Sequence, residues 1–321
     1  MKKKKIIITG GAGFIGSHLV DKMVSKNFDV VVLDNFSTGR IENLKHVENK
    51  IEIVECDLSE KSKWELNFKN CSTVFHLAAL ADIVPSITNP KEYFDSNVKG
   101  TFNVLEACVK NNVQRLVYSS SASVYGDAVK VPMTEEHPFN NRNFYGASKI
   151  ACEAMCRAFY DRYGLNYVGL RYMNVYGPHQ DQTAAYTGVV PIMLNKIEAN
   201  EPPTINGDGS QAYDFIYVED VARSNLCALK SDVEFGMYNV GTEVQTSIKE
   251  LCDIILGLKK STLKVNYKPY SQDDARSLVQ NRIGSRVKAE KELGFRYKYS
   301  LKVGLKKLIE WRIQTGIDKK N

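Results

Sequence analysis

Tyr145 and Lys149 are two residues whose types and spacing could perform acid–base chemistry. They lie four positions apart in a segment of good helix formers without proline, so a helix would place both side chains on one face. A lysine ammonium close to a phenol favours the phenolate and lowers a pKa that is about 10 in free tyrosine. The pair could therefore act as a general base near neutral pH. The same spacing also arises on solvated helix faces, so the interpretation depends on other parts of the chain.

A glycine-rich segment near the N-terminus, Thr9–Gly16, separates the first apolar run from the first expected helix. Its glycines at positions 10, 13 and 16 allow a tight turn, close approach of the backbone to a pyrophosphate, and close packing of helix on strand. Asp34 ends the next apolar run, near the distance expected for a carboxylate that binds the ribose hydroxyls of NAD. This pattern predicts a dinucleotide site, with a plain glycine-rich turn as the structural alternative.

Two further features bear on the cofactor. Arg40 would favour NADP, but it lies six residues beyond Asp34, whose carboxylate would repel a 2′-phosphate. We therefore predict NAD. Asp57 and Leu58 follow the third expected strand and are placed to meet the adenine ring, although a polar cap at the end of a strand is an equally ordinary interpretation.

The elements that position these residues alternate between short apolar runs and amphipathic stretches. This alternation predicts a parallel sheet with helices on both faces, because strands buried on both sides read as continuous apolar runs. The expected strands are residues 5–9, 29–33, 51–55, 73–77, 115–119 and 166–171. The expected helices are residues 15–26, 93–111 and 145–163.

The pattern changes after about residue 171, where turn signals such as Pro202-Pro203 become denser. We therefore predict two lobes. Residues 1–171 would form an α/β, Rossmann-type doubly wound parallel sheet that binds NAD, and residues 172–321 a smaller mixed α/β lobe that binds substrate. Residues 215–218 and 238–240 are expected to return to the sheet.

Composition limits the other function classes. The chain has 321 residues, 43% of them hydrophobic and 25% charged, as in ordinary globular proteins. Its net charge of +6 comes partly from lysines at the two ends, which favours an anionic substrate over nucleic acid. The apolar run before Thr9 is too short for a signal peptide, and no run is long enough to span a membrane. The seven scattered cysteines form no metal-binding pattern, so we expect a cytoplasmic protein with reduced thiols and no bound metal.

In these motifs and their order, the chain resembles the extended short-chain dehydrogenases/reductases, in their nucleotide-sugar epimerase/dehydratase branch. The matching runs are residues 9–16, 34–39, 76–79, 97–101, 119–126, 145–149 and 171–177, with looser matches at 215–221 and 288–294. The resemblance implies that Tyr145 is the catalytic base and acid and that Lys149 holds the nicotinamide ribose. It also implies that Ser121 bonds the sugar hydroxyl that is oxidised.

The resemblance implies an NAD site built from many backbone and side-chain contacts. Its members would be Gly10, Gly13, Phe14, Ile15, Gly16, Asp34, Asn35, Thr38, Gly39, Asp57, Leu58, Leu77, Ala78, Ala79, Asn97, Ser119, Tyr145, Lys149 and Tyr172.

The two positions after Ser121 distinguish the reactions of this branch. Dehydratases carry an Asp-Glu pair there and uronate decarboxylases a glutamate at the second position, whereas this chain has Ala122 and Ser123. The substitution favours C4 epimerisation of a nucleotide-activated hexose, such as UDP-glucose/galactose or UDP-GlcNAc/GalNAc, with tightly bound and recycled NAD. The alternatives are a UDP-uronic acid 4-epimerase, a nucleotide-sugar reductase with net hydride transfer, and a catalytically silent NAD-binding protein.

The substrate lobe matches the branch less closely. Asn174 matches an asparagine that contacts the substrate diphosphate, but Tyr213 and His179 stand where arginines are common, so a guanidinium clamp on the phosphates is missing. Arg276 and Arg282 could supply that charge, or could be solvated surface residues. The remaining candidates near the sugar are Ser86, Ser121, Ser123, Val189 and residues 180–186.

The resemblance also implies a homodimer. Helices 93–111 and 145–163 resemble the helices that form a four-helix dimer interface in this branch, although their apolar faces would also fit packing on the sheet.

Overall fold

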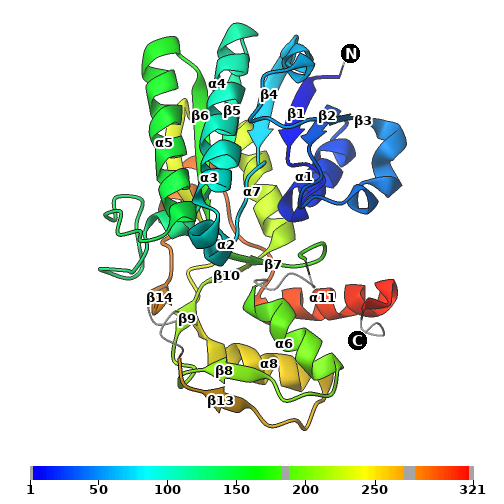
Figure 1. The fold of residues 1–321 in the computed structure, drawn as a ribbon, viewed down its shortest axis with the longest axis vertical. Coiled ribbons are helices and arrows are strands. Elements are labelled where there is room, and N and C mark those ends of the chain that lie inside the picture. The colour runs from blue at the N-terminus through cyan, green and yellow to red at the C-terminus, as the bar shows by residue number, and fades with distance from the viewer. Residues whose placement is uncertain (1–2, 182–187, 271–278, 318–321) are drawn as a thin grey trace.

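A seven-stranded parallel sheet forms the centre of the computed structural model, which describes residues 3–181, 188–270 and 279–317 (Figure 1). The strand order is β11-β6-β5-β4-β1-β2-β3, so the order reverses between β1 and β4. The strands are β1 Lys5–Thr9, β2 Asp29–Asp34, β3 Ile51–Glu55, β4 Cys71–His76, β5 Arg115–Ser121, β6 Asn166–Tyr172 and β11 Phe235–Val240. The predicted Rossmann-type sheet is confirmed.

Helices cover both faces of this sheet, and each face has its own apolar core. On one face, Ile6 and Ile8 pack in a core that includes Leu19 of α1. On the other face, Ile7 packs in a core that includes Leu105 of α4 and Cys152 of α5. This alternation is the reason that β1 reads as an unbroken apolar run. The covering helices are α1 Phe14–Ser25, α4 Gly100–Lys110, α5 Phe144–Tyr163, α7 Val218–Lys230 and α10 Val287–Leu293.

The predicted strands and helices lie within two residues of the observed ones, apart from the start of the second helix. Residues 93–111 belong to a longer helical run made of α3 Pro90–Tyr93, a π-helical segment η4 Phe94–Lys99, and α4. Short helical turns that the sequence pattern did not predict connect the strands. These are η1 Ile41–Asn43, η2 Lys45–Lys50, η3 Lys63–Phe68, α2 Ile83–Thr88 and η5 Ala122–Val124.

A smaller lobe lies beyond the carboxyl ends of the strands, at the lower end of Figure 1. Its helices are α6 Val189–Glu198, α8 Ile248–Lys259 and α11 Leu301–Thr315, which share a third apolar core. Its short strands are β7 Asn174–Tyr176, β8 Thr204–Asn206, β9 Ala212–Tyr213, β10 Phe215–Tyr217, β12 Thr246–Ser247, β13 Asn266–Lys268 and β14 Asn281–Arg282. They form small parallel and antiparallel sheets, so the lobe is mixed as predicted.

The chain crosses between the two parts more than once. Residues 238–240 lie in β11, which pairs with β6 at the edge of the large sheet. Residues 215–217 instead form β10, which pairs with β7 outside that sheet, and the chain then enters α7. In the part of the chain that the structure describes, no helix combines the length and apolar character needed to cross a bilayer.

Candidate active site

The glycine-rich turn between β1 and α1 has a backbone that only glycine can adopt. Gly10 has a φ of +66°, and a Cβ at this position would lie 2.7 Å from the Ala78 amide nitrogen on the neighbouring β4 loop. A Cβ on Gly16 would overlap the Gly10 carbonyl oxygen. Helix α1 begins at Phe14, and no side chain caps its N-terminus. Its first backbone N–H groups are therefore available to an anion such as a pyrophosphate.

Asp34 lies at the carboxyl end of β2, directly beside this turn. Its carboxylate accepts hydrogen bonds from the backbone N–H groups of Ala12 and Phe36, each at 2.9 Å. Burial raises the pKa of Asp34, and these N–H bonds act in the opposite direction. Arg40, the residue that would favour NADP, directs its guanidinium to the Asp181 carboxylate at 3.3 Å. The carboxylate of Asp34 therefore lies beside the glycine-rich turn, while the Arg40 guanidinium is paired with Asp181.

One cavity gathers nearly all of the expected NAD-binding residues at the carboxyl edge of the sheet. It is lined by Gly10, Gly13, Phe14, Ile15, Gly16, Asp34, Asn35, Thr38, Gly39, Asp57, Leu58, Leu77, Ala78, Ala79, Ser119, Tyr145, Lys149 and Tyr172. Asn97 lies behind the wall, where its amide side chain donates to the Leu80 carbonyl oxygen at 2.9 Å and to the Ser148 hydroxyl at 3.0 Å. The glycines, the uncapped helix and the Asp34 carboxylate fit a dinucleotide in this cavity.

Some residues of the cavity wall were not expected from the sequence. They are Leu33, Ser37, Cys56, Ser59, Leu80, Ala81, Ser96 and Ser120. Most of them are neighbours in sequence of an expected residue, and this is the only feature of the sequence that could have indicated them.

Lys149 lies on α5, which begins beside the serine-rich end of β5. The Asn143 side chain accepts from the Gly146 N–H at 2.8 Å and so caps the start of this helix. The Lys149 ammonium donates to the Ser119 carbonyl oxygen at 2.9 Å, and lies 5.9 Å from the centre of the Tyr145 ring. Burial lowers the pKa of Lys149 to about 8. The helical spacing thus places both side chains at the same cavity.

The pKa of Tyr145 differs from the expectation based on spacing. Burial raises it, and this effect outweighs the hydrogen bond with Ser121 and the positive charge of Arg282, which both lower it. Lys149, which was expected to lower the pKa of Tyr145, is not among the groups that do so.

The serine segment that ends β5 is fixed by its neighbours on α5 and β6. Ser120 donates to the Glu153 carboxylate, which forms a buried ion pair with Arg171 at 2.7 Å. The Ser119 hydroxyl shares a hydrogen bond with the Tyr172 phenol at 3.0 Å. Ser121 accepts from the Ser123 N–H at 3.1 Å, which begins the turn η5. The strand end is therefore rigid where Ser121 meets Tyr145.

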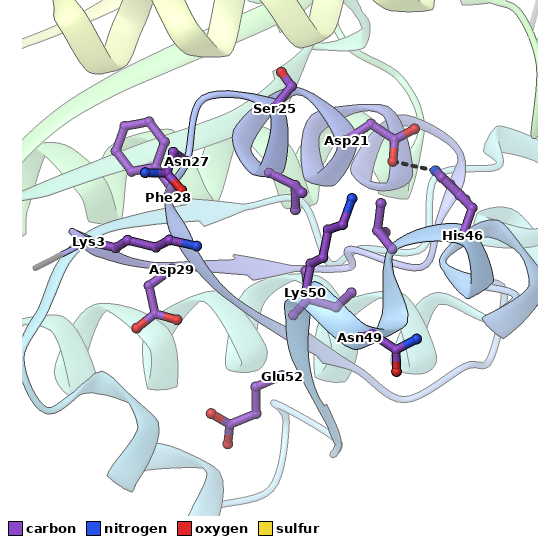
Figure 2. A pocket seen from close by; sticks show the side chains of 13 residues that line it. Lys3, Asp21, Ser25, Asn27, Phe28, Asp29, His46, Asn49, Lys50 and Glu52 are labelled. Atoms are coloured by element: carbon purple, nitrogen blue, oxygen red, sulfur yellow. Dashed lines mark hydrogen bonds and ion pairs between the residues drawn. The ribbon is translucent and has the colours of Figure 1, made fainter.

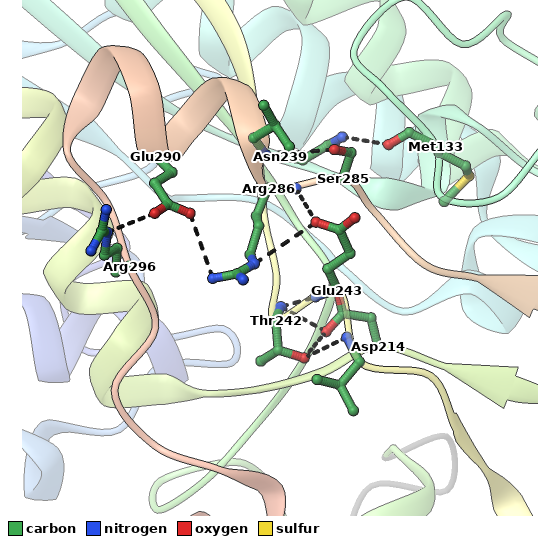
Figure 3. Close-up of polar contacts among 11 residues, drawn as sticks. Met133, Asp214, Asn239, Thr242, Glu243, Ser285, Arg286, Glu290 and Arg296 are labelled. Atoms are coloured by element: carbon green, nitrogen blue, oxygen red, sulfur yellow. Dashed lines mark hydrogen bonds and ion pairs between the residues drawn. The ribbon is translucent and has the colours of Figure 1, made fainter.

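Asn174 is held by the segment that follows Tyr213. Its backbone N–H and its side-chain amide both donate to the Asp214 carbonyl oxygen, at 3.0 and 3.1 Å. Figure 3 shows the Asp214 carboxylate accepting from the Thr242 hydroxyl and from the N–H groups of Thr242 and Glu243. Burial raises the pKa of Asp214 to about 6. Glu243 in turn lies 3.8 Å from the Arg286 guanidinium, so a charged network supports the residues behind Asn174.

Four of the other substrate candidates lie among the described residues at separate places in the fold. The Tyr213 phenol donates to the Val279 carbonyl oxygen at 2.8 Å, and Ser86 donates to the Ile83 carbonyl oxygen at 2.5 Å. The Ser123 hydroxyl is buried and has no hydrogen-bond partner among the described residues. Val189 is the first residue of α6. Arg276 and residues 182–186 lie outside the described residues.

His179 contacts helix α1. Its ring shares a hydrogen bond with the Ser17 hydroxyl of α1 at 2.8 Å and stacks on His18, with 4.9 Å between ring centres. Burial lowers its pKa to about 4. A neutral His179 therefore joins the smaller lobe to α1.

A second cavity is lined by residues of α1, β2, η2 and β3 and shares no lining residue with the first (Figure 2). It is an open groove where opposite charges alternate, and Asp21 and His46 form a 2.7 Å contact within it. It contains none of the expected site residues. The described residues also contain no cluster of histidine, cysteine, aspartate or glutamate placed to hold a metal ion.

Comparisons with known proteins agree with this geometry. A profile of the NAD dependent epimerase/dehydratase family matches residues 6–241. A putative UDP-glucose 4-epimerase of Methanocaldococcus jannaschii is 39% identical over 311 residues, which cover 95% of this chain and 97% of that protein. UDP-glucuronic acid decarboxylase 1 of Arabidopsis thaliana is 31% identical, over 96% of this chain and 69% of that protein.

Solved structures of two 4-epimerases superpose on nearly the whole chain. The UDP-N-acetylglucosamine 4-epimerase of Methanobrevibacter ruminantium M1, in complex with UDP-N-acetylmuramic acid, has a TM-score of 0.92 and 33% identity, covering 98% of this chain and 100% of that one. The UDP-glucose 4-epimerase of Thermotoga maritima, with UDP-glucose, has a TM-score of 0.91 and 35% identity, covering 97% and 99%. The chain therefore belongs to the NAD dependent epimerase/dehydratase family.

Proposed function

We propose that this protein is a 4-epimerase of a nucleotide-activated hexose, with UDP as the nucleotide. One observation carries the proposal. Tyr145, Lys149 and Ser121 meet at the edge of the cofactor cavity, while the two positions after Ser121 are the buried Ala122 and Ser123, which offer no carboxyl group. The chain thus has groups that move one proton at a sugar hydroxyl, and lacks the second acid–base pair that dehydration would need.

The chain's own residues would act on the hydroxyl of carbon 4. Tyr145 accepts its proton, Ser121 holds its oxygen by a hydrogen bond, and Lys149 positions the cofactor ribose through an ammonium fixed on Ser119. NAD, when bound, supplies the acceptor and later the donor of the hydride at carbon 4. The resulting 4-keto sugar turns about its bond to the diphosphate, and Tyr145 returns the proton after reduction of the opposite face. Because the reaction has no net oxidation, NAD would not need to exchange between turnovers.

The substrate assignment rests on the smaller lobe and on the relatives. Residues 1–171 would bind NAD and residues 172–321 the nucleotide sugar, with Asn174 on the diphosphate. Ser86, Ser123, Val189, Tyr213, Arg276 and Arg282 are the further candidates around the nucleotide and the sugar. UDP is the nucleotide in the names of the 4-epimerases to which this chain is similar. A homodimer in the cytoplasm, built through α4 and α5, completes the proposal.

The test uses purified protein without added cofactor and a panel of UDP-hexoses that includes N-acetylated and uronic forms. Proton NMR reports the configuration at carbon 4. Inversion of one member without added NAD supports an epimerase with resident cofactor and identifies the sugar. Release of CO₂ from a UDP-uronic acid would replace the proposal with decarboxylation, and a requirement for stoichiometric NADH would replace it with a reductase.

A further inference from the structure

The ammonium of Lys149 is buried without a carboxylate partner among the described residues. Lys149 is 4% exposed, and its ammonium donates a hydrogen bond to the carbonyl oxygen of Ser119 at 2.9 Å. Arg171 is buried to the same degree, but it binds the Glu153 carboxylate at 2.7 Å. A charge that is removed from water needs other groups to replace its hydration. The neighbours of Lys149 must therefore stabilise its charge in another way.

The ring of Tyr118 lies against this ammonium. Tyr118 belongs to β5, directly before Ser119, and is 1% exposed. The Lys149 nitrogen lies 5.1 Å from the centre of the Tyr118 ring, within the range of about 6 Å in which the face of an aromatic ring attracts a cation. The Tyr145 ring lies at 5.9 Å, near the limit of that range. Consecutive residues of β5 thus offer a ring face and a carbonyl oxygen to the same ammonium.

The packing around Tyr118 fixes its ring beside Lys149. The ring belongs to the apolar core that α4 and α5 form on one face of the sheet. The His76 ring of β4 lies next to it, with 6.0 Å between the ring centres. His76 is fixed in turn by hydrogen bonds that it shares with the hydroxyls of Thr9 at 2.7 Å and Thr101 at 2.9 Å. The fold therefore gives the Tyr118 ring little freedom to move away from the ammonium.

The titratable groups near Lys149 do not provide it with a bound counter-ion among the described residues. Burial raises the pKa of Tyr118, so its phenol is neutral and offers the ammonium a ring without a negative charge. Burial lowers the pKa of His76 to about 3, so this ring is neutral as well. Burial also lowers the pKa of Lys149 to about 8, and it outweighs three groups of α5 that act to raise this pKa. These groups are Cys152, Glu153 and Cys156.

We propose that Tyr118 is a positioning residue for Lys149, and that the face of its ring stabilises the buried ammonium and holds it at the cofactor cavity. Ser119 and Lys149 line that cavity, whereas Tyr118 is not among the described residues of its wall, so Tyr118 acts through Lys149. A cation–π contact is stronger in a buried site, because no water competes for the cation. The role of Lys149 at the ribose rests on the proposed function, but the contact itself can be measured without turnover.

The first test is a double-mutant cycle between Tyr118→Leu and Lys149→Met, measured by urea unfolding with NAD present. The Kd of each variant for NAD is measured in parallel, so that the stabilisation by bound NAD can be subtracted. Lys149 is charged at pH 6 and neutral at pH 10, because its pKa is about 8. The coupling should therefore be about 10- to 30-fold in the unfolding constant at pH 6 and fall to within about twofold at pH 10. Equal coupling at the two pH values would mean that the side chains only pack together, and would overturn the proposal.

Two comparisons separate the ring face from general packing. Tyr167→Leu is the matched control, because Tyr167 is buried in the same apolar core, and its cycle with Lys149→Met should show no coupling that changes with pH. A fluorinated phenylalanine at position 118 keeps the shape of the ring, while fluorine withdraws negative charge from its face. Tyr118→Phe should keep most of the coupling and the fluorinated ring should lose it. Equal coupling for these two rings would contradict the proposal, and this comparison does not depend on the folding of Tyr118→Leu.

Binding of NAD distinguishes this proposal from the proposed function. If Lys149 holds the nicotinamide ribose, Tyr118→Leu should raise the Kd for NAD about 3- to 10-fold, because the ammonium loses part of its charge-assisted hydrogen bond, whereas Tyr167→Leu should not. Coupling that depends on pH, together with an unchanged Kd, would support the contact between Tyr118 and Lys149 and contradict the role of Lys149 at the ribose. A raised Kd in a protein that inverts none of the UDP-hexoses would support the positioning role and contradict only the proposed reaction.

Discussion

At the scale of single residues, the proposed mechanism assigns the acid–base role to Tyr145. Burial raises the pKa of its phenol. Tyr145→Phe keeps the ring and its packing but removes the proton-transfer group, so we expect kcat to fall about 10²- to 10⁴-fold. Resident NAD, measured by absorbance after denaturation, should be unchanged. Activity of the variant near that of the unaltered protein would exclude the mechanism.

The second residue-scale prediction concerns Lys149 and pH. Its pKa in the folded protein, about 8, lies below the ordinary value of 10.5, so the unfolded chain binds more protons between these values. The contribution of Lys149 to stability therefore rises with pH from about 8 to 10.5, and its burial destabilises the fold most below pH 8.

Lys149→Met removes this titration. The difference in unfolding free energy between the variant and the unaltered protein should shift by about 2 kcal/mol, against the variant, between pH 7 and pH 10. Urea unfolding of both proteins across this range measures the shift, and subtraction cancels the other titrating groups. If the unfolding free energies of the two proteins change in parallel with pH, Lys149 is not buried as a charged group.

At the scale of elements, the sequence predicted those strands and helices that a local pattern of apolar residues determines. Six of the seven strands of the large sheet were visible as apolar runs. Most of them have buried residues on both faces, whereas β3, at the edge of the sheet, is only partly buried. Strands β9 and β14 were not predicted, since each has two residues and exists only through pairing across a long stretch of chain. The Asp214 network was likewise hidden, because its donors come from Thr242 and Glu243, more than 25 residues away.

That network makes an element-scale prediction. The Asp214 carboxylate accepts from two N–H groups and one hydroxyl, and an asparagine would place its own N–H donors against some of them. Asp214→Asn should therefore reduce the unfolding free energy by about 2–4 kcal/mol and raise the KM for the nucleotide sugar, because Asn174 is bound to the same residue. Denaturant titration and initial rates measure the two effects.

Arg286→Gln is the matched control for Asp214→Asn. It breaks the outer pairs with Glu243 and Glu290, at 3.8 and 3.6 Å, which are partly exposed. We expect a loss below about 1 kcal/mol and an unchanged KM. Equal losses in both variants would show that the network acts as one unit and that Asp214 has no special part in it.

At the scale of the whole molecule, the cofactor side and the substrate side of the candidate site differ in how well the sequence predicts them. The residues of the expected NAD site lie in continuous motifs at the ends of β1, β2, β4 and β5, so the order of these motifs along the chain predicted most of one cavity wall. The substrate side is assembled from short, distant segments, and no sequence spacing indicated that Arg282 lies opposite Tyr213. The pKa of Tyr145 also required the structure, because burial is a property of the assembled fold.

The last prediction concerns assembly of two chains. Helices α4 and α5 lie side by side on one flank of the sheet (Figure 1), and this flank leaves Phe94 and Phe102 exposed by 57% and 41%. Large apolar side chains gathered on a rigid helical face favour burial against a second copy. We expect a dimer at micromolar concentration, and Phe102→Asp should shift it to monomer in sedimentation velocity. Val303→Asp, at an exposed apolar position on α11, should leave the dimer intact. An unaltered protein that sediments as a monomer would contradict the prediction, because the exposed phenylalanines would then have no partner to explain them.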